Sequence, residues 1–171
     1  AVFSLVAWSA FLAVVAAISA RGPPRLAYLA VAPVSLRADA LSVSVAVVVT
    51  AVALLVLLVA VPEIQAGRWR FYALMLVFVA AVLLTVFADS LLALLAGWEV
   101  MGATSYALIA HDRQQAAVVR AGGVAFVTTR AADVGLYLAA GAAIAGTVDV
   151  RGTGADRLAL SGLAQLPAPW L

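Results

Sequence analysis

The acidic residue Glu99 lies near the middle of a largely apolar stretch that runs from Ala88 to Ala110, ADSLLALLAGWEVMGATSYALIA. Placing a charged side chain at the centre of a bilayer costs about 2.5–3.5 kcal/mol on insertion scales. Acidic residues that are kept at this depth mark ion pathways and proton relays. Glu99 is therefore the first candidate functional residue, and the chemistry it can support is transfer of a proton or an ion.

Arg130 and Asp133 are further charged residues that we expect inside the membrane. They are three positions apart, so on a helix they share one face and can pair. Such a pair either joins neighbouring helices or takes part in function, and the spacing alone does not separate these two interpretations. Because Arg130 cannot readily lose its proton, it can tune Glu99 or Asp133 but cannot relay a proton itself.

Small residues surround Glu99, namely Gly97, Gly102, Ala103 and Ser105. Small residues allow two membrane helices to approach closely. They also leave room for water beside a carboxylate. Both interpretations stay open from the sequence, with close packing favoured for the glycines.

The amino-acid composition is typical of a membrane protein, since 67% of the 171 residues are hydrophobic and 11% are charged. A soluble domain has about 45–50% apolar and about 25% charged residues. We therefore expect an all-α fold, a polytopic bundle of transmembrane helices.

Several kinds of site lack the residues they would need. The sequence has no cysteine, which excludes disulfides, iron–sulfur ligation and thiol catalysis. Its single histidine, His111, has no cluster of acids or cysteines with which to hold a metal. There is no phosphate-binding or dinucleotide-binding glycine motif, and a net charge of +2 does not indicate nucleic-acid binding. We expect no cofactor, no metal and no nucleic-acid partner.

The apolar stretches predict about five spans, because about 20 helical residues cross a hydrocarbon core roughly 30 Å thick. We place these spans at residues 1–20, 41–61, 71–88, 91–110 and 118–145, so that residues 1–145 form the transmembrane bundle. Residues 146–171 are more polar and predict a loop with a short amphipathic helix at about 156–163, leading to a span beyond the chain.

The segments between the spans carry their own signals. Leu26 to Asp39 contains Pro33 and β-branched residues, which predicts an extended or hairpin connector. Asp39 and Ser42 stand where the N-cap of the second span is needed, and Asp89 can cap the fourth. The connection at Asp89 is so short that the third and fourth spans must be antiparallel neighbours.

Three stretches carry a resemblance to a known family: LRADALSVSVAVVV, RFYALMLVFVAAVLLTVFADSLLALLAGWEVMGATSYALIA and AFVTTRAADVGLYLAAGAAIAGTVDV. They resemble the antiporter-like, proton-translocating membrane subunits of respiratory complex I, nearest to the subunit L or chain 5 family. The resemblance runs from about Leu36 to Val150. The pattern D-x-L-L-x(4)-G-W-E, followed by S-Y-x-L-I, is fairly specific to this superfamily. The chain begins with Ala1 rather than Met, and we expect an N-terminal fragment of such a subunit.

The resemblance implies roles for individual residues. Glu99 matches the family's channel glutamate, which lies in a proton half-channel. Arg130 and Asp133 match a charged pair thought to couple channel hydration to the neighbouring antiporter subunit. Asp39 matches an acid that opens a segment which often reads D-x-L-S in the family. The loop of residues 21–38 is expected on the outer side of the membrane. The family also uses lysines on later helices, whereas this sequence has no lysine, so the 171 residues alone are not expected to pump.

We therefore expect a proton-translocating subunit of a complex I-type NADH–quinone oxidoreductase, part of a translocase with no redox site of its own. Its partners would be other membrane subunits, the lipid bilayer and protons, and its location the bacterial inner (plasma) membrane as a multi-pass protein. The alternatives are a subunit of a multisubunit cation/proton antiporter, an energy-converting hydrogenase or an inorganic-carbon uptake complex. A structural membrane scaffold, with Glu99 a hydrogen-bonded remnant, is a further alternative.

Overall fold

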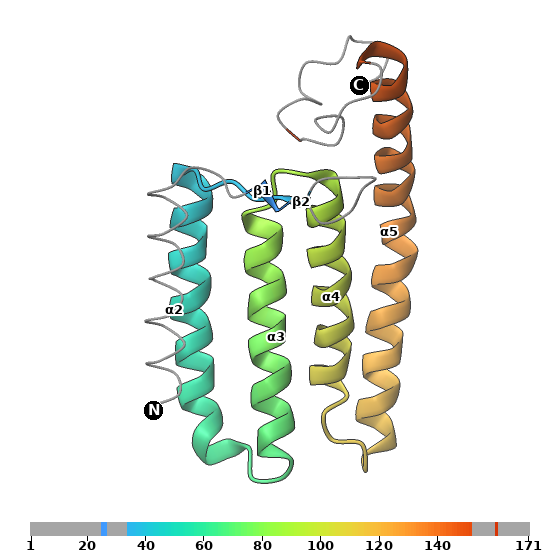
Figure 1. Ribbon diagram of the computed structural model, residues 1–171. Helices are drawn as coiled ribbons and strands as arrows, with labels where there is room; N and C mark the ends of the chain where they lie inside the picture. Colours follow the sequence, from blue (N-terminus) through green and yellow to red (C-terminus); the bar gives the residue numbers. More distant parts are fainter. Residues whose placement is uncertain (1–24, 27–33, 152–159, 161–171) are drawn as a thin grey trace.

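Four long helices form the described part of the protein. The computed structural model describes residues 25–26, 34–151 and 160. The helices are α2 (Ala40–Glu63), α3 (Arg68–Val86), α4 (Leu91–Ile109) and α5 (Ala116–Arg151). They lie side by side in chain order, and each contacts the next (Figure 1). The expected all-α bundle is confirmed, and the predicted first span, residues 1–20, lies outside the described residues.

Membrane-crossing length and apolarity are found in α2, α3 and α4. These helices correspond to the second, third and fourth predicted spans. The fifth predicted span is also helical. Within the described residues, however, α5 is not among the helices that are both long and apolar enough to cross a membrane. Its central part contains Arg130 and Asp133 together with many small residues, and these lower its mean hydropathy.

The most extensive helix contacts are those between α3 and α4. A two-residue step separates Phe87, the C-cap of α3, from Ser90, the N-cap of α4, so the two helices form an antiparallel hairpin as predicted. Gly97 is buried where α4 crosses α3, and a Cβ there would lie 3.0 Å from the Thr85 nitrogen and 3.1 Å from the Ala81 oxygen. The missing side chain therefore sets how near the two backbones lie.

The N-terminus of α2 is closed by a capping box, as the sequence predicts. Asp39 Oδ1 accepts a hydrogen bond from the Ser42 backbone N–H at 2.7 Å, and Ser42 Oγ accepts one from the Asp39 N–H at 2.8 Å. At α4 the predicted cap, Asp89, is wrong. Ser90 is the N-cap and its Oγ accepts from the Ala93 N–H at 3.3 Å, because a cap side chain reaches the amide three residues later.

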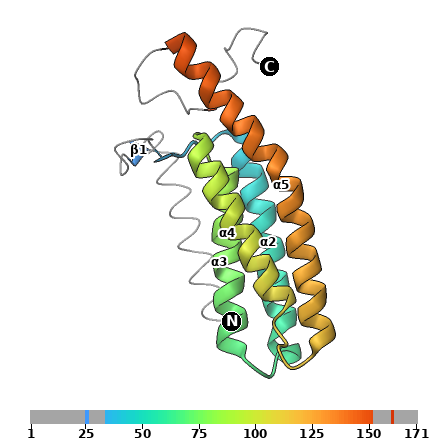
Figure 2. The same ribbon diagram turned by 90° about the vertical axis from the view of Figure 1, so that its right-hand side faces the viewer.

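Helix α5 is longer than predicted. It begins at Ala116, and its backbone stays helical to Arg151, beyond the predicted end at residue 145. No proline interrupts this segment, so the composition change after Gly146 does not end the helix. The end of α5 extends past the other helices (Figure 2). The predicted amphipathic helix near residues 156–163 lies, apart from Leu160, outside the described residues.

The connector before α2 contains two short strands, β1 (Arg25–Leu26) and β2 (Val34–Ser35). They pair antiparallel, which agrees with the predicted extended or hairpin connector. Leu36 then forms a bridge with Ala88, and the Arg37 N–H donates to the Phe87 oxygen at 2.8 Å. The connector is thereby fixed to the turn between α3 and α4.

Candidate functional site

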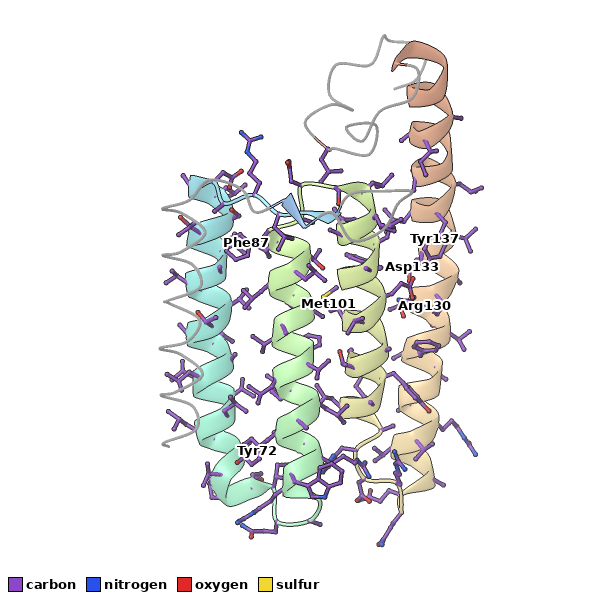
Figure 3. The ribbon with its side chains drawn as sticks, in the orientation of Figure 1. Tyr72, Phe87, Met101, Arg130, Asp133 and Tyr137 are labelled. Atoms are coloured by element: carbon purple, nitrogen blue, oxygen red, sulfur yellow. The ribbon has the colours of Figure 1, made fainter. Side chains whose placement is uncertain are left out.

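Arg130 of α5 lies between two carboxylates. Its Nη1 binds Oε2 of Glu99, which projects from the middle of α4. Its Nη2 lies 2.8 Å from Oδ2 of Asp133, one turn further along α5. The structure therefore brings together the three residues that the sequence singled out. Arg130 lies beside Asp133 on α5 (Figure 3), and it joins α5 to α4 in addition to pairing within its own helix.

A glycine makes room for this arginine. A Cβ placed on Gly102 of α4 would collide with Nη2 of Arg130. The guanidinium therefore rests against the α4 backbone one turn from Glu99. Of the two glycines near Glu99, Gly97 admits α3 and Gly102 admits Arg130, so both support the close-packing interpretation.

Asp133 is the most deeply buried member of the group, with 4% of its surface exposed. Its Oδ1 accepts a hydrogen bond from Nε1 of Trp98 at 2.8 Å. Trp98 precedes Glu99 in α4, so two successive residues of α4 contact Asp133 and Arg130 of α5. Sequence reasoning missed Trp98, although an indole N–H in an apolar span needs an acceptor and this requirement could have indicated it.

Aromatic rings contact the other sides of Arg130. The ring of Phe126, one turn earlier on α5, has its centre 5.4 Å from the guanidinium carbon, a distance suited to cation–π attraction. Tyr106 of α4 packs on Phe126 with ring centres 5.4 Å apart. The Tyr137 hydroxyl lies 3.4 Å from Nη1 of Arg130. None of these three aromatic residues was predicted from the sequence to belong to the site.

Exposure differs between the two carboxylates. The side chain of Glu99 is 44% exposed, that of Arg130 is 21% exposed and that of Asp133 is 5% exposed. Within the described residues Oε1 of Glu99 is buried without a hydrogen-bond partner. By the exposure of the whole side chain, we call Glu99 the open end of the group and Asp133 its closed end.

A second polar region lies just past the C-terminal end of α4. The His111 Nε2 atom lies 3.3 Å from the Ala66 oxygen, and Nη2 of Arg70 donates to the His111 oxygen at 2.8 Å. These contacts join the α2–α3 loop and the first turn of α3 to the α4–α5 loop around an open cavity of about 480 Å³. Among the described residues there is no group of three or more His, Cys, Asp or Glu side chains that could hold a metal ion.

The comparison with protein families gives a match over residues 88–153 to the family described as NADH:quinone oxidoreductase/Mrp antiporter, transmembrane. This range contains α4 and α5 entirely, and with them Trp98, Glu99, Arg130 and Asp133.

Curated relatives agree with this match. The chain is 39% identical over 70 residues to the F(420)H(2) dehydrogenase subunit L of Methanosarcina mazei, which covers 41% of this chain and 10% of that protein. It is 39% identical over 69 residues to the NADH-quinone oxidoreductase subunit L of Mycobacterium tuberculosis, which covers 40% of this chain and 11% of that protein. The matched part is thus a small fraction of the length of either relative.

Proposed function

We propose, on the premise that residues 88–153 belong to the NADH:quinone oxidoreductase/Mrp antiporter transmembrane family, that the chain is part of a proton-translocating subunit in which protons pass Glu99. The observation that carries this proposal is the group formed by Glu99, Arg130 and Asp133 between α4 and α5. These two helices make up most of the part that matches the family.

The charge balance of this group suits a proton site. Two ionised carboxylates and one guanidinium add up to a net charge of −1, and an uncompensated charge is costly in surroundings of low polarity. Uptake of one proton makes the group neutral. Because Arg130 keeps its proton, a carboxylate must be the group that exchanges it.

Glu99 is the better exchange site of the two carboxylates. Its side chain is more exposed than that of Asp133, and Oε1 has no hydrogen-bond partner among the described residues. Asp133, in contrast, accepts a hydrogen bond from Trp98 on one oxygen and forms an ion pair with Arg130 through the other. We therefore assign proton transfer to Glu99 and a supporting role to Asp133.

Arg130 supplies a means of control. A cation changes the electrostatic surroundings of the carboxylate it pairs with, so moving the guanidinium from Glu99 toward Asp133 would change the charge balance at Glu99. Both carboxylates are within reach of one guanidinium. We propose that a neighbouring membrane subunit biases this movement, which is how redox energy would reach a site that holds no redox group.

The proposal also covers the surroundings of the protein. The relatives are named as subunits, so we expect other membrane subunits as partners, with the helices in a lipid bilayer. The apolar helices and the family match make this a multi-pass membrane protein. We propose the bacterial inner membrane as its location, which the mycobacterial relative supports.

Replacing Glu99 with Gln in the complete subunit, assembled in its membrane complex, tests this function. Gln keeps the size of the side chain but cannot carry the proton, so the number of protons translocated per electron should fall. Glu63→Gln is the matched control, because Glu63 is exposed at the end of α2. A normal ratio in an assembled Glu99→Gln complex would contradict the proposal.

The second candidate function is cation/proton exchange without a redox partner, and it is favoured by the family description, which includes Mrp antiporters. Membrane vesicles separate the two. Acidification driven by an electron donor supports the redox-linked pump, whereas acidification or alkalinisation driven only by a sodium gradient supports the antiporter. Glu99→Gln should impair either activity, because both require a proton at the same carboxylate.

A further inference from the structure

We propose that Trp98 is a positioning residue for proton transfer at Glu99: its indole N–H holds Asp133, and this leaves the aligned N–H of Arg130 for Glu99. The inference rests on the proposed function, in which protons pass Glu99. Trp98 contacts neither the proton nor the carboxylate of Glu99, and it acts through Asp133 and Arg130 of α5.

Asp133 is held by a hydrogen bond and an ion pair. Trp98 Nε1 donates to Oδ1 at 2.8 Å from the neighbouring helix. Oδ2 lies 2.8 Å from Nη2 of Arg130, but this ion pair is not aligned as a hydrogen bond. Among the described residues, the aligned side-chain donor to Asp133 is therefore the indole of Trp98.

Arg130 forms its aligned hydrogen bond with Glu99 and not with Asp133. Its Nη1 donates to Oε2 of Glu99 and lies 3.4 Å from the Tyr137 hydroxyl. The guanidinium thus directs its aligned N–H across to α4, while its charge is shared with Asp133 on its own helix. One arginine serves two carboxylates because another donor supports the second carboxylate.

Loss of the indole N–H would change this division. A buried carboxylate without an aligned donor is unfavourable, since buried acceptors need hydrogen-bond partners. Arg130 is the nearest remaining donor, so it would turn toward Asp133 and its contact with Glu99 would weaken. The site would then hold its guanidinium at the closed end, away from the carboxylate that exchanges protons.

The exposure of the Trp98 ring indicates that the indole N–H, and not the ring, is the part of this residue that matters at the site. The residue is 37% exposed, so much of the indole lies on the helix surface. Asp133, in contrast, is almost completely buried. The contact that is enclosed by the protein is therefore the one between the N–H and the carboxylate.

Two variants of the complete subunit in its membrane complex separate the donor from the ring. Trp98→Phe keeps an aromatic ring and removes the N–H, whereas Trp98→Gln removes the ring and keeps an amide N–H donor. We expect Trp98→Phe to lower the rate of proton translocation by about tenfold, as for loss of a hydrogen bond to a charged group. Trp98→Gln should retain more of the rate than Trp98→Phe. Trp69→Phe, at a residue that is 77% exposed, is the matched control and should behave as wild type.

A double variant tests whether Trp98 acts through Asp133. Because Asn carries no charge to be supported, Trp98→Phe should lower the rate no further in an Asp133→Asn background, whereas independent effects would add. The proposal is overturned if Trp98→Phe translocates protons normally, if Trp98→Gln is no better than Trp98→Phe, or if the effects add. An inactive Glu99→Gln beside a normal Trp98→Phe overturns only this inference. A normal Glu99→Gln overturns the proposed function itself.

Discussion

The guanidinium of Arg130 occupies the space in which a Cβ on Gly102 would lie. The two residues are on different helices, so the absence of a side chain on α4 permits the position of a charge on α5. Because the same guanidinium binds Glu99, the identity of residue 102 is linked to the ion pair at the centre of the site.

Gly102→Ala should displace Arg130. The added methyl collides with Nη2, the end of a flexible side chain that can move aside, so we expect the free energy of unfolding to fall by only about 1 kcal/mol, the low end of the range for overpacking. Gly123→Ala is the matched control, because a Cβ at Gly123 meets nothing within 4 Å in the same pair of helices. Thermal unfolding of the complete protein in detergent measures both variants. Equal melting temperatures for the two would contradict the predicted collision.

Gly97→Ala should loosen the α3–α4 hairpin. A Cβ at this position meets backbone atoms of Thr85 and Ala81, which cannot move aside as a flexible side chain can. We expect a loss of about 1–3 kcal/mol in the free energy of unfolding. Adding Thr85→Ala removes only the clash with the hydroxyl, so it should restore part of the loss. Complete rescue by Thr85→Ala would show that the backbone approach is not the limiting contact.

Arg130→Gln should destabilise the protein more than Arg130→Gln combined with Asp133→Asn. The single change leaves two carboxylates without their shared cation, and we expect it to lower the free energy of unfolding by roughly 1–3 kcal/mol, less than for a fully buried pair because Glu99 is partly exposed. The double change removes one of the carboxylates as well. Chemical denaturation of both variants gives the comparison, and a double variant less stable than the single one would contradict it.

The cap of α2 should depend on pH. Hydrogen bonds from the Ser42 backbone N–H, and then from its hydroxyl, hold the pKa of Asp39 below its ordinary value of 3.8. A carboxyl whose pKa is lowered by folding stabilises the fold above the unfolded pKa, and this contribution is lost as the pH falls through the folded pKa. Hydrogen exchange of residues 40–46, corrected for intrinsic rates, should therefore quicken only below about pH 3.8. Asp39→Asn should remove this pH dependence; a variant with an unchanged pH profile would show that another group is responsible.

Features set by local sequence were predictable. Long apolar stretches indicated α2, α3 and α4, and the spacing of Asp39 and Ser42 indicated a cap that the structure contains. The pairing of Arg130 with Asp133 followed from their separation by three positions on one helix. In each case the interacting residues are within one helical turn, so the helical period alone brings them together.

Features that depend on how helices pack were not predictable in the same way. The contact of Arg130 with Glu99 joins residues 31 positions apart, and it requires α4 and α5 to lie at one particular height relative to each other. The Trp98–Asp133 hydrogen bond needs that same alignment, across 35 positions. The end of α5 was also missed, because a change toward polar residues does not break a helix without a proline or a cap.

The turn of the α3–α4 hairpin differs from its middle in what its contacts require. At the turn, Leu36 pairs with Ala88 and the Leu160 N–H donates to the Asp89 oxygen, both through main-chain groups. Bonds between backbone groups form with almost any side chain, so this junction can survive extensive sequence divergence. The contacts among Trp98, Glu99 and Arg130 with their partners need specific atoms, so homologous subunits should vary freely at the turn and change at the centre only through paired substitutions.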